Sequence, residues 1–99
     1  MLDGEVTFRH GDEVIRAGPG TFLNMPVGSL HTFRNDTARP ARMLVSVAPA
    51  GLERMFAEVG QPVAPDAVTA PPPTPEDIQR LLAAAPRYGI DIRLPPGAV

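Results

Sequence analysis

The first half of the chain alternates between apolar and polar positions, and turn-forming residues separate the short alternating segments. Within residues 5–9, Val6 and Phe8 fall on one face and polar side chains on the other, which predicts a half-buried strand. Residues 13–16 return as its partner strand after a hairpin turn at Gly11, because glycine adopts positive φ without steric cost.

Three further segments extend the strand pattern. Residues 21–24 and 30–35 are predicted as short strands, each preceded by a turn rich in Pro and Gly. Residues 41–48 contain Met-Leu-Val-Ser-Val, which is apolar on nearly both faces and predicts a buried central strand. Five short strands with turn signals between them predict an all-β sandwich or barrel.

The second half changes to a helical period. Apolar residues between positions 52 and 59 recur at the i, i+3, i+4, i+7 spacing, and Gly60 follows them as a C-cap, which predicts an amphipathic helix. Residues 61–73 contain five prolines and no periodicity, which predicts an extended arm. We therefore expect two parts, residues 1–48 and residues 49–99.

A second helix is predicted after the arm. Thr74, Pro75 and Asp77 match the N-cap, first and third positions of a helix start, and Pro86 would end the helix. Residues 88–94 could add a short strand before Pro95 and Pro96 end the ordered structure.

Length, net charge and cysteine content exclude several classes of function for this chain. The chain has 99 residues, which fit one small domain, and a net charge of −2, which gives no electrostatic basis for binding nucleic acid or an anionic membrane. It has no cysteine, which excludes disulfides, thiolate nucleophiles and cysteine-ligated metals and agrees with a cytoplasmic location. Arginine without lysine suggests a bacterial genome of high GC content. No apolar run approaches the ~18 residues of a membrane span.

The most informative spacing is G-x5-P-x-G-x2-H-x3-N, formed by Gly20, Pro26, Gly28, His31 and Asn35. It resembles the second conserved motif of the cupin family without a mismatch. Cupins are jelly-roll barrels that usually hold one divalent metal, commonly iron, manganese, nickel or zinc. The resemblance implies that His31 is one metal ligand and that the chain is a mainly β, partial cupin jelly-roll barrel with two C-terminal helices.

The first cupin motif supplies two histidines and a glutamate to the same metal, and it would lie upstream of Gly4. Because the chain starts at Met1, the resemblance implies a barrel that is incomplete at its N-terminus. The other histidine, His10, is expected at a hairpin tip, pointing away from the barrel interior. Since a catalytic first-row metal site normally takes three protein ligands, we expect a metal only if the missing ligands are supplied.

Each site residue also has a structural interpretation. His31 could be packed inside the barrel with local hydrogen bonds, and Asn35 could cap the end of a strand or form a turn. In both the functional and the structural interpretation, Gly20, Pro26 and Gly28 are expected to form turns. Five apolar residues are core candidates that would also line a substrate pocket: Phe22, Met25, Phe33, Met43 and Val45.

An incomplete barrel would leave a sheet edge and part of its apolar interior exposed, which predicts closure by a homodimer. The expected function is a small-molecule-binding barrel, a remnant or fragment of a metal-dependent cupin of the quercetin-dioxygenase-like bacterial type, with dioxygenase- or isomerase-like chemistry and no assigned reaction. Whether the chain is an enzyme stays open. The alternative is a non-enzymatic, metal-free binding or dimerisation module.

Overall fold

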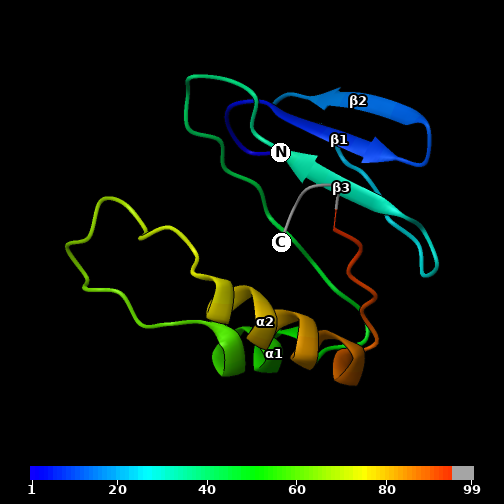
Figure 1. Ribbon diagram of the computed structural model, residues 1–99. Coiled ribbons are helices and arrows are strands. Elements are labelled where there is room, and N and C mark those ends of the chain that lie inside the picture. The colour runs from blue at the N-terminus through cyan, green and yellow to red at the C-terminus, as the bar shows by residue number, and fades with distance from the viewer. Residues whose placement is uncertain (95–99) are drawn as a thin grey trace. The chain divides into compact units, whose positions relative to one another are not determined.

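The computed structural model describes residues 1–94, and the chain divides into two compact units (Figure 1). The β unit comprises residues 1–46, and the helical unit begins at Val47. Within the part of the chain that is described, no helix has the length and apolar character needed to cross a membrane.

The β unit is built on one antiparallel sheet with the strand order β2-β1-β3. Its strands are β1 (Val6–His10), β2 (Glu13–Ala17) and β3 (His31–Arg34). The predicted hairpin between β1 and β2 is confirmed, since Gly11 adopts a φ of 60° in the two-residue turn. In the centre of the sheet, Phe8 lies opposite Ile15 on β2 and Phe33 on β3.

Two predicted strands are absent from residues 1–94, those at residues 21–24 and 41–48. Their pairing is limited to their first residues: the Met1 amino group donates to the Thr21 carbonyl oxygen at 2.8 Å, and Arg42 forms an isolated bridge with Asp3. A strand persists only where a neighbouring backbone continues beside it. Within residues 1–94 no further backbone pairing continues along either segment, so their apolar pattern alone does not make a strand.

Burial in the β unit is small. Val6 and Ala17, which lie opposite each other on β1 and β2, are its buried residues. A close backbone approach adds to the packing, because Gly4 adopts a φ of 74° and a Cβ atom there would lie 2.5 Å from the Pro40 carbonyl oxygen. Only glycine fits such a position without strain.

The helical unit contains α1 (Leu52–Val59), α2 (Pro75–Ala84) and the 3-10 helix η1 (Ala85–Tyr88). Both predicted helices are confirmed, and the N–H of Gly60 donates to the Phe56 carbonyl oxygen at 2.8 Å at the end of α1. Met55, Ala84 and Ala85 form a buried cluster. The partly buried residues packed on this cluster are Leu52, Val59, Leu81, Tyr88, Ile90 and Ile92.

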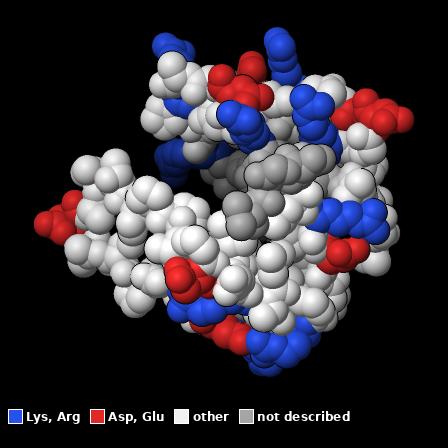
Figure 2. All heavy atoms as spheres, in the orientation of Figure 1, with Lys and Arg blue, Asp and Glu red and all other residues white. Residues whose placement is uncertain are grey.

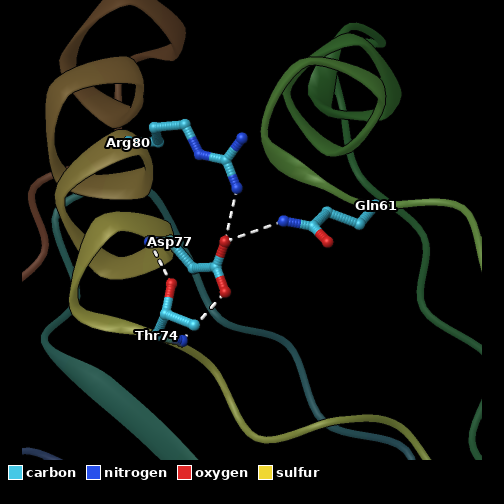
Figure 3. A network of polar contacts seen from close by, with 4 residues as sticks. All are labelled: Gln61, Thr74, Asp77 and Arg80. Atoms are coloured by element: carbon cyan, nitrogen blue, oxygen red, sulfur yellow. Dashed lines mark hydrogen bonds and ion pairs between the residues drawn. The ribbon is translucent and has the colours of Figure 1, made fainter.

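The start of α2 is a capping box, as the sequence predicts (Figure 3). The N–H of Asp77 donates to the Thr74 hydroxyl at 3.1 Å, and the N–H of Thr74 donates to the Asp77 carboxylate at 2.8 Å. The same carboxylate accepts hydrogen bonds from Gln61, at 3.0 Å, and from Arg80. The hydrogen bond from the Thr74 backbone is the main reason that the pKa of Asp77 is lowered. This network connects Gln61, two residues after α1, to the first turn of α2.

The segment after α2 differs from the prediction. Instead of a strand over residues 88–94, η1 continues from α2, and Gly89 then adopts a φ of 76°. Ile90 donates its N–H to the Ala85 carbonyl oxygen at 3.0 Å, and Ile90 and Ile92 pack on the helical cluster. Their alternation therefore reflects packing on helices. Pro86 lies within η1, and the predicted end at Pro95 and Pro96 lies outside the described residues.

Candidate functional site

The motif histidine stands at the first position of β3, directly after a tight turn. Gly28 adopts a φ of 87° in this turn, and the N–H of Ser29 donates to the Pro26 carbonyl oxygen at 3.1 Å. The positive φ requires glycine or a strained residue. Proline and glycine in this spacing thus reverse the chain and deliver His31 onto an edge strand of the sheet.

The His31 side chain is exposed and has a local hydrogen-bond partner. Its Nδ1 lies 3.0 Å from the Ser29 hydroxyl oxygen and 3.1 Å from the Ser29 carbonyl oxygen. The carbonyl oxygen can only accept, while the hydroxyl can donate or accept, so the tautomer with the imidazole proton on Nδ1 suits both contacts. In this tautomer the Nε2 lone pair is free, as it is in a metal-binding histidine whose other ring nitrogen donates to a neighbouring oxygen.

The last motif residue shapes the loop after β3. The Asn35 amide donates to the Arg39 carbonyl oxygen at 2.7 Å. Its oxygen accepts from the N–H and the hydroxyl of Thr37 at 2.9 and 2.7 Å. Asn35 therefore organises a turn, as asparagine commonly does. Gly20, the first motif residue, adopts a φ of 84° and follows β2 at the corresponding break.

The sheet register brings three polar residues of one face into a row. His10 lies opposite Glu13 on β2 and opposite His31 on β3. Because side chains alternate along a strand, His10 shares its face with Phe8 and Val6. His10 lies at the hairpin tip, as expected, and the register places it on the same face of the sheet as His31. Hydropathy could not find this pairing, since it depends on a contact 21 residues apart in the sequence.

The predicted pocket-lining residues do not form a buried cluster. Phe22, Phe33 and Val45 are exposed, and Met25 and Met43 are partly buried. The expectation that these five form the core is wrong, because four of them lie in segments outside the sheet. Phe33 does have an aromatic neighbour, since its ring centroid lies 5.6 Å from that of Phe8.

The β unit has a shallow depression. Asp3, Glu5 and Arg39 give it charged walls of both signs. Its other lining residues are Gly4, Pro19, Thr37 and Pro40. It contains none of the five predicted pocket residues and neither histidine.

The ligand set implied by the cupin resemblance does not fit the part of the chain that is described. Among residues 1–94, no group of three or more histidine, aspartate or glutamate side chains could hold a metal ion. The cupin site would need two further histidines and a glutamate beside His31. The described residues do not bring such a set together. No chemical step through such a metal follows from these residues.

Charged side chains are mixed in sign over the surface. Figure 2 shows blue and red side chains interspersed on the face drawn, with broad uncharged areas between them. One cluster belongs to the helical unit, where the Glu58 carboxylate accepts hydrogen bonds from Arg87 and from the Tyr88 hydroxyl, the latter at 2.7 Å. The hydrogen bond from Arg87 lowers the pKa of Glu58 most, and the hydrogen bond from Tyr88 lowers it further. These contacts join α1 to η1 and have a structural role.

Comparison with known proteins gives one match. Residues 1–47 match the family model described as the cupin domain. No curated protein and no solved structure gives a significant match. The matched segment includes the whole sheet, the motif and His31, and it supports the predicted resemblance to the cupin superfamily. The predicted fold class is confirmed: three antiparallel strands and two following helices, with a cupin-domain match over the β part, are consistent with a partial cupin barrel that carries C-terminal helices.

Proposed function

We propose that this chain is a small-molecule-binding module of the cupin type, derived from a metal-dependent cupin with dioxygenase- or isomerase-like chemistry. The observation that carries the proposal is the cupin-domain match over residues 1–47, which includes a sheet with His31 on one face. Fold alone does not assign a reaction, so the proposal names a binding function and a type of parent enzyme, a cupin of the quercetin-dioxygenase-like bacterial type.

The face of the sheet that carries His31 supports a binding role. It presents Phe8, Ile15 and Phe33 beside His10 and His31. Ligand sites combine apolar walls with a few polar groups that fix orientation. An iron, manganese, nickel or zinc ion belongs to this proposal where further ligands come from outside the described residues, with His31 as one ligand.

The alternative is a metal-free module that binds a second copy of the chain. It is favoured by the large apolar side chains that the β unit leaves exposed: Leu2, Val14, Phe22, Val27, Leu30, Phe33, Leu44 and Val45. It is also favoured by the position of β3 at the edge of the sheet. An exposed strand edge beside apolar side chains is a template for pairing with another chain.

Metal content and intact mass of the protein purified from its native source, measured on the same sample, test the proposal. A metal-dependent cupin should carry about one iron, manganese, nickel or zinc ion per chain and lose it in His31→Ala. A mass above 10.5 kDa would supply a segment for the missing ligands. Metal-free protein that sediments as a dimer would contradict the metal-dependent proposal and support the alternative.

A further inference from the structure

We propose that His10 and His31 form a two-histidine chelating site for a divalent transition metal ion, with zinc as the representative ion, on one face of the sheet. The site lies within a single chain. It does not rest on the proposed function, because His10 lies outside the cupin motif and the argument uses only the sheet register.

The register places the two histidines in the closer of the two kinds of antiparallel pair. His10 lies directly opposite His31. The next residue pair is joined by a hydrogen bond from the Gly11 N–H to the Leu30 carbonyl oxygen at 3.0 Å. Hydrogen-bonded and non-hydrogen-bonded pairs alternate, so His10 and His31 are a non-hydrogen-bonded pair, with Cα atoms about 4.5 Å apart.

The adjacent aromatic pair shows that side chains meet across these strands. Phe8 and Phe33 are two residues further along the same face and form the next non-hydrogen-bonded pair. Their ring centroids are 5.6 Å apart. Opposite Cβ atoms in such pairs lie about 4.5–5.5 Å apart. The Cβ atoms of His10 and His31 belong to the same kind of pair as those of Phe8 and Phe33.

Both imidazoles have a nitrogen available for a metal. In His31 the tautomer with the proton on Nδ1, which suits the contact with Ser29, leaves the Nε2 lone pair free. Among the hydrogen bonds and ion pairs of residues 1–94, none uses the His10 ring, which is half-buried at the end of β1. The His31 ring is held by its contact with Ser29, and the His10 ring is half-buried. Less conformational entropy is therefore lost when the two rings bind a metal.

The geometry suits an ion that prefers nitrogen ligands. Zinc–nitrogen bonds are about 2.0–2.1 Å long, so a tetrahedral ion holds two imidazole nitrogens about 3.3 Å apart. Side chains that start from opposite Cβ atoms can converge to this distance. Imidazole favours zinc, copper and nickel over magnesium and calcium. Glu13 lies beyond His10 in the same row, but no group of three ligands is formed within the described residues. The site therefore has two protein ligands and open positions.

Zinc titration of the full chain, followed by nitrogen-15 NMR of the imidazoles, tests the site. Since His10 and His31 are the two histidines of the chain, every imidazole signal is assignable. We expect both rings to respond over the same zinc range, with one ion per chain. His10→Asn and His31→Asn should each weaken zinc binding roughly tenfold or more, since the loss of even an outer-shell partner has an effect of that size. The double variant, which has no imidazole, should bind zinc at least as weakly as either single variant.

An exchange variant provides the matched control. Arg9→His combined with His10→Arg keeps the composition but moves one imidazole to the opposite face of β1, and it should bind zinc as weakly as His10→Asn. Glu13→Gln should change the affinity less than twofold. The contact between the Phe8 and Phe33 rings, seen as a nuclear Overhauser effect, verifies the sheet in each variant.

Three results would overturn the proposal. They are unchanged affinity in His10→Asn or in the exchange variant, one zinc ion per two chains, and a loss in Glu13→Gln equal to that in His10→Asn. The requirement for His10 separates this site from the cupin metal of the proposed function, which needs His31 and ligands from outside the described residues.

Discussion

The β unit and the helical unit are held together by different interactions. In the β unit, β1 is paired along its length with β2 and over four residues with β3, while burial is limited to Val6 and Ala17. In the helical unit, a buried cluster around Met55 is covered by partly buried side chains from both helices and from the segment after η1. Backbone pairing dominates the first unit and side-chain packing dominates the second.

This difference indicates where a partner is needed. Hydrogen bonds position strands, but each contributes little net stability because water competes for the same groups. Burial of apolar area contributes most of the folding free energy. The β unit exposes Phe22, Val27 and Leu44, so its sheet has apolar surface to bury against a second layer. The helical unit buries Met55 in a cluster of its own, although Phe56, Val63 and Val68 remain exposed.

The largest expected change in the free energy of unfolding comes from the buried cluster of Met55, Ala84 and Ala85. Met55→Ala removes a side chain that is 4% exposed, and it should lower the free energy of unfolding by about 2–3 kcal/mol. Phe56→Ala is the control on the same helix, since Phe56 is 59% exposed, and it should cost less than about 1 kcal/mol. Urea denaturation of the full chain measures both. Equal losses would show that the cluster does not stabilise the helical unit.

The next effect tests backbone geometry in the β unit. Gly4→Ala combines a positive φ with a Cβ that would overlap the Pro40 carbonyl oxygen, and it should cost about 1–3 kcal/mol. Gly28→Ala has a similar φ but open space around the Cβ, so its cost should be about 1 kcal/mol. Thermal unfolding followed by the strand signal in circular dichroism compares the two. A smaller loss for Gly4→Ala would contradict the close approach.

The capping box of α2 should contribute less. Thr74→Ala removes the hydroxyl that accepts from the Asp77 N–H, and it should cost about 1 kcal/mol. Thr69→Ala, in the exposed segment between the helices, should change stability by less than about 0.5 kcal/mol. The helical circular dichroism signal during urea denaturation measures the change. A β-unit signal that moved by the same amount would show that the two units unfold together.

The smallest effect is a dependence on alkaline pH in the helical unit. The hydrogen bond to Glu58 raises the pKa of Tyr88, so the folded state favours the neutral phenol. This contribution is present below the ordinary tyrosine pKa of about 10 and is lost as the pH rises through the higher folded value. Tyr88 is the single tyrosine, so its ultraviolet titration is unambiguous. Glu58→Gln should move the midpoint down, and an unchanged midpoint would contradict the contact.

The Glu58 carboxylate makes stability depend on pH in the acid range, with the opposite sign to Tyr88. Its lowered pKa means that its contribution is present above the ordinary glutamate pKa of about 4.3 and is lost as the pH falls through the lower folded value. Because the partners are largely exposed, solvent screening keeps the effect small.

Local sequence signals predicted the elements that depend on neighbours in the chain. The alternation around Val6 and Phe8, the turn at Gly11 and the capping residues Thr74 and Asp77 act within a few positions, and the structure has the hairpin and both helices there. The strand predictions at residues 21–24 and 41–48 were wrong, because a strand also needs a partner that the pattern does not encode. The apolar alternation of residues 88–94 was misassigned for the same reason.

The candidate site divides in the same way. Sequence by itself determined the motif, the turn that precedes His31 and the cupin resemblance, since these depend on residue spacing and on the backbone freedom of glycine. Tertiary structure decided which residues meet: the pairing of β1 with β3 brings His10 opposite His31, and Phe22 and Val45 stay outside the core. The physical reason is that strand register is set by hydrogen bonds between distant segments, and a shift of one residue would move every side chain to the other face.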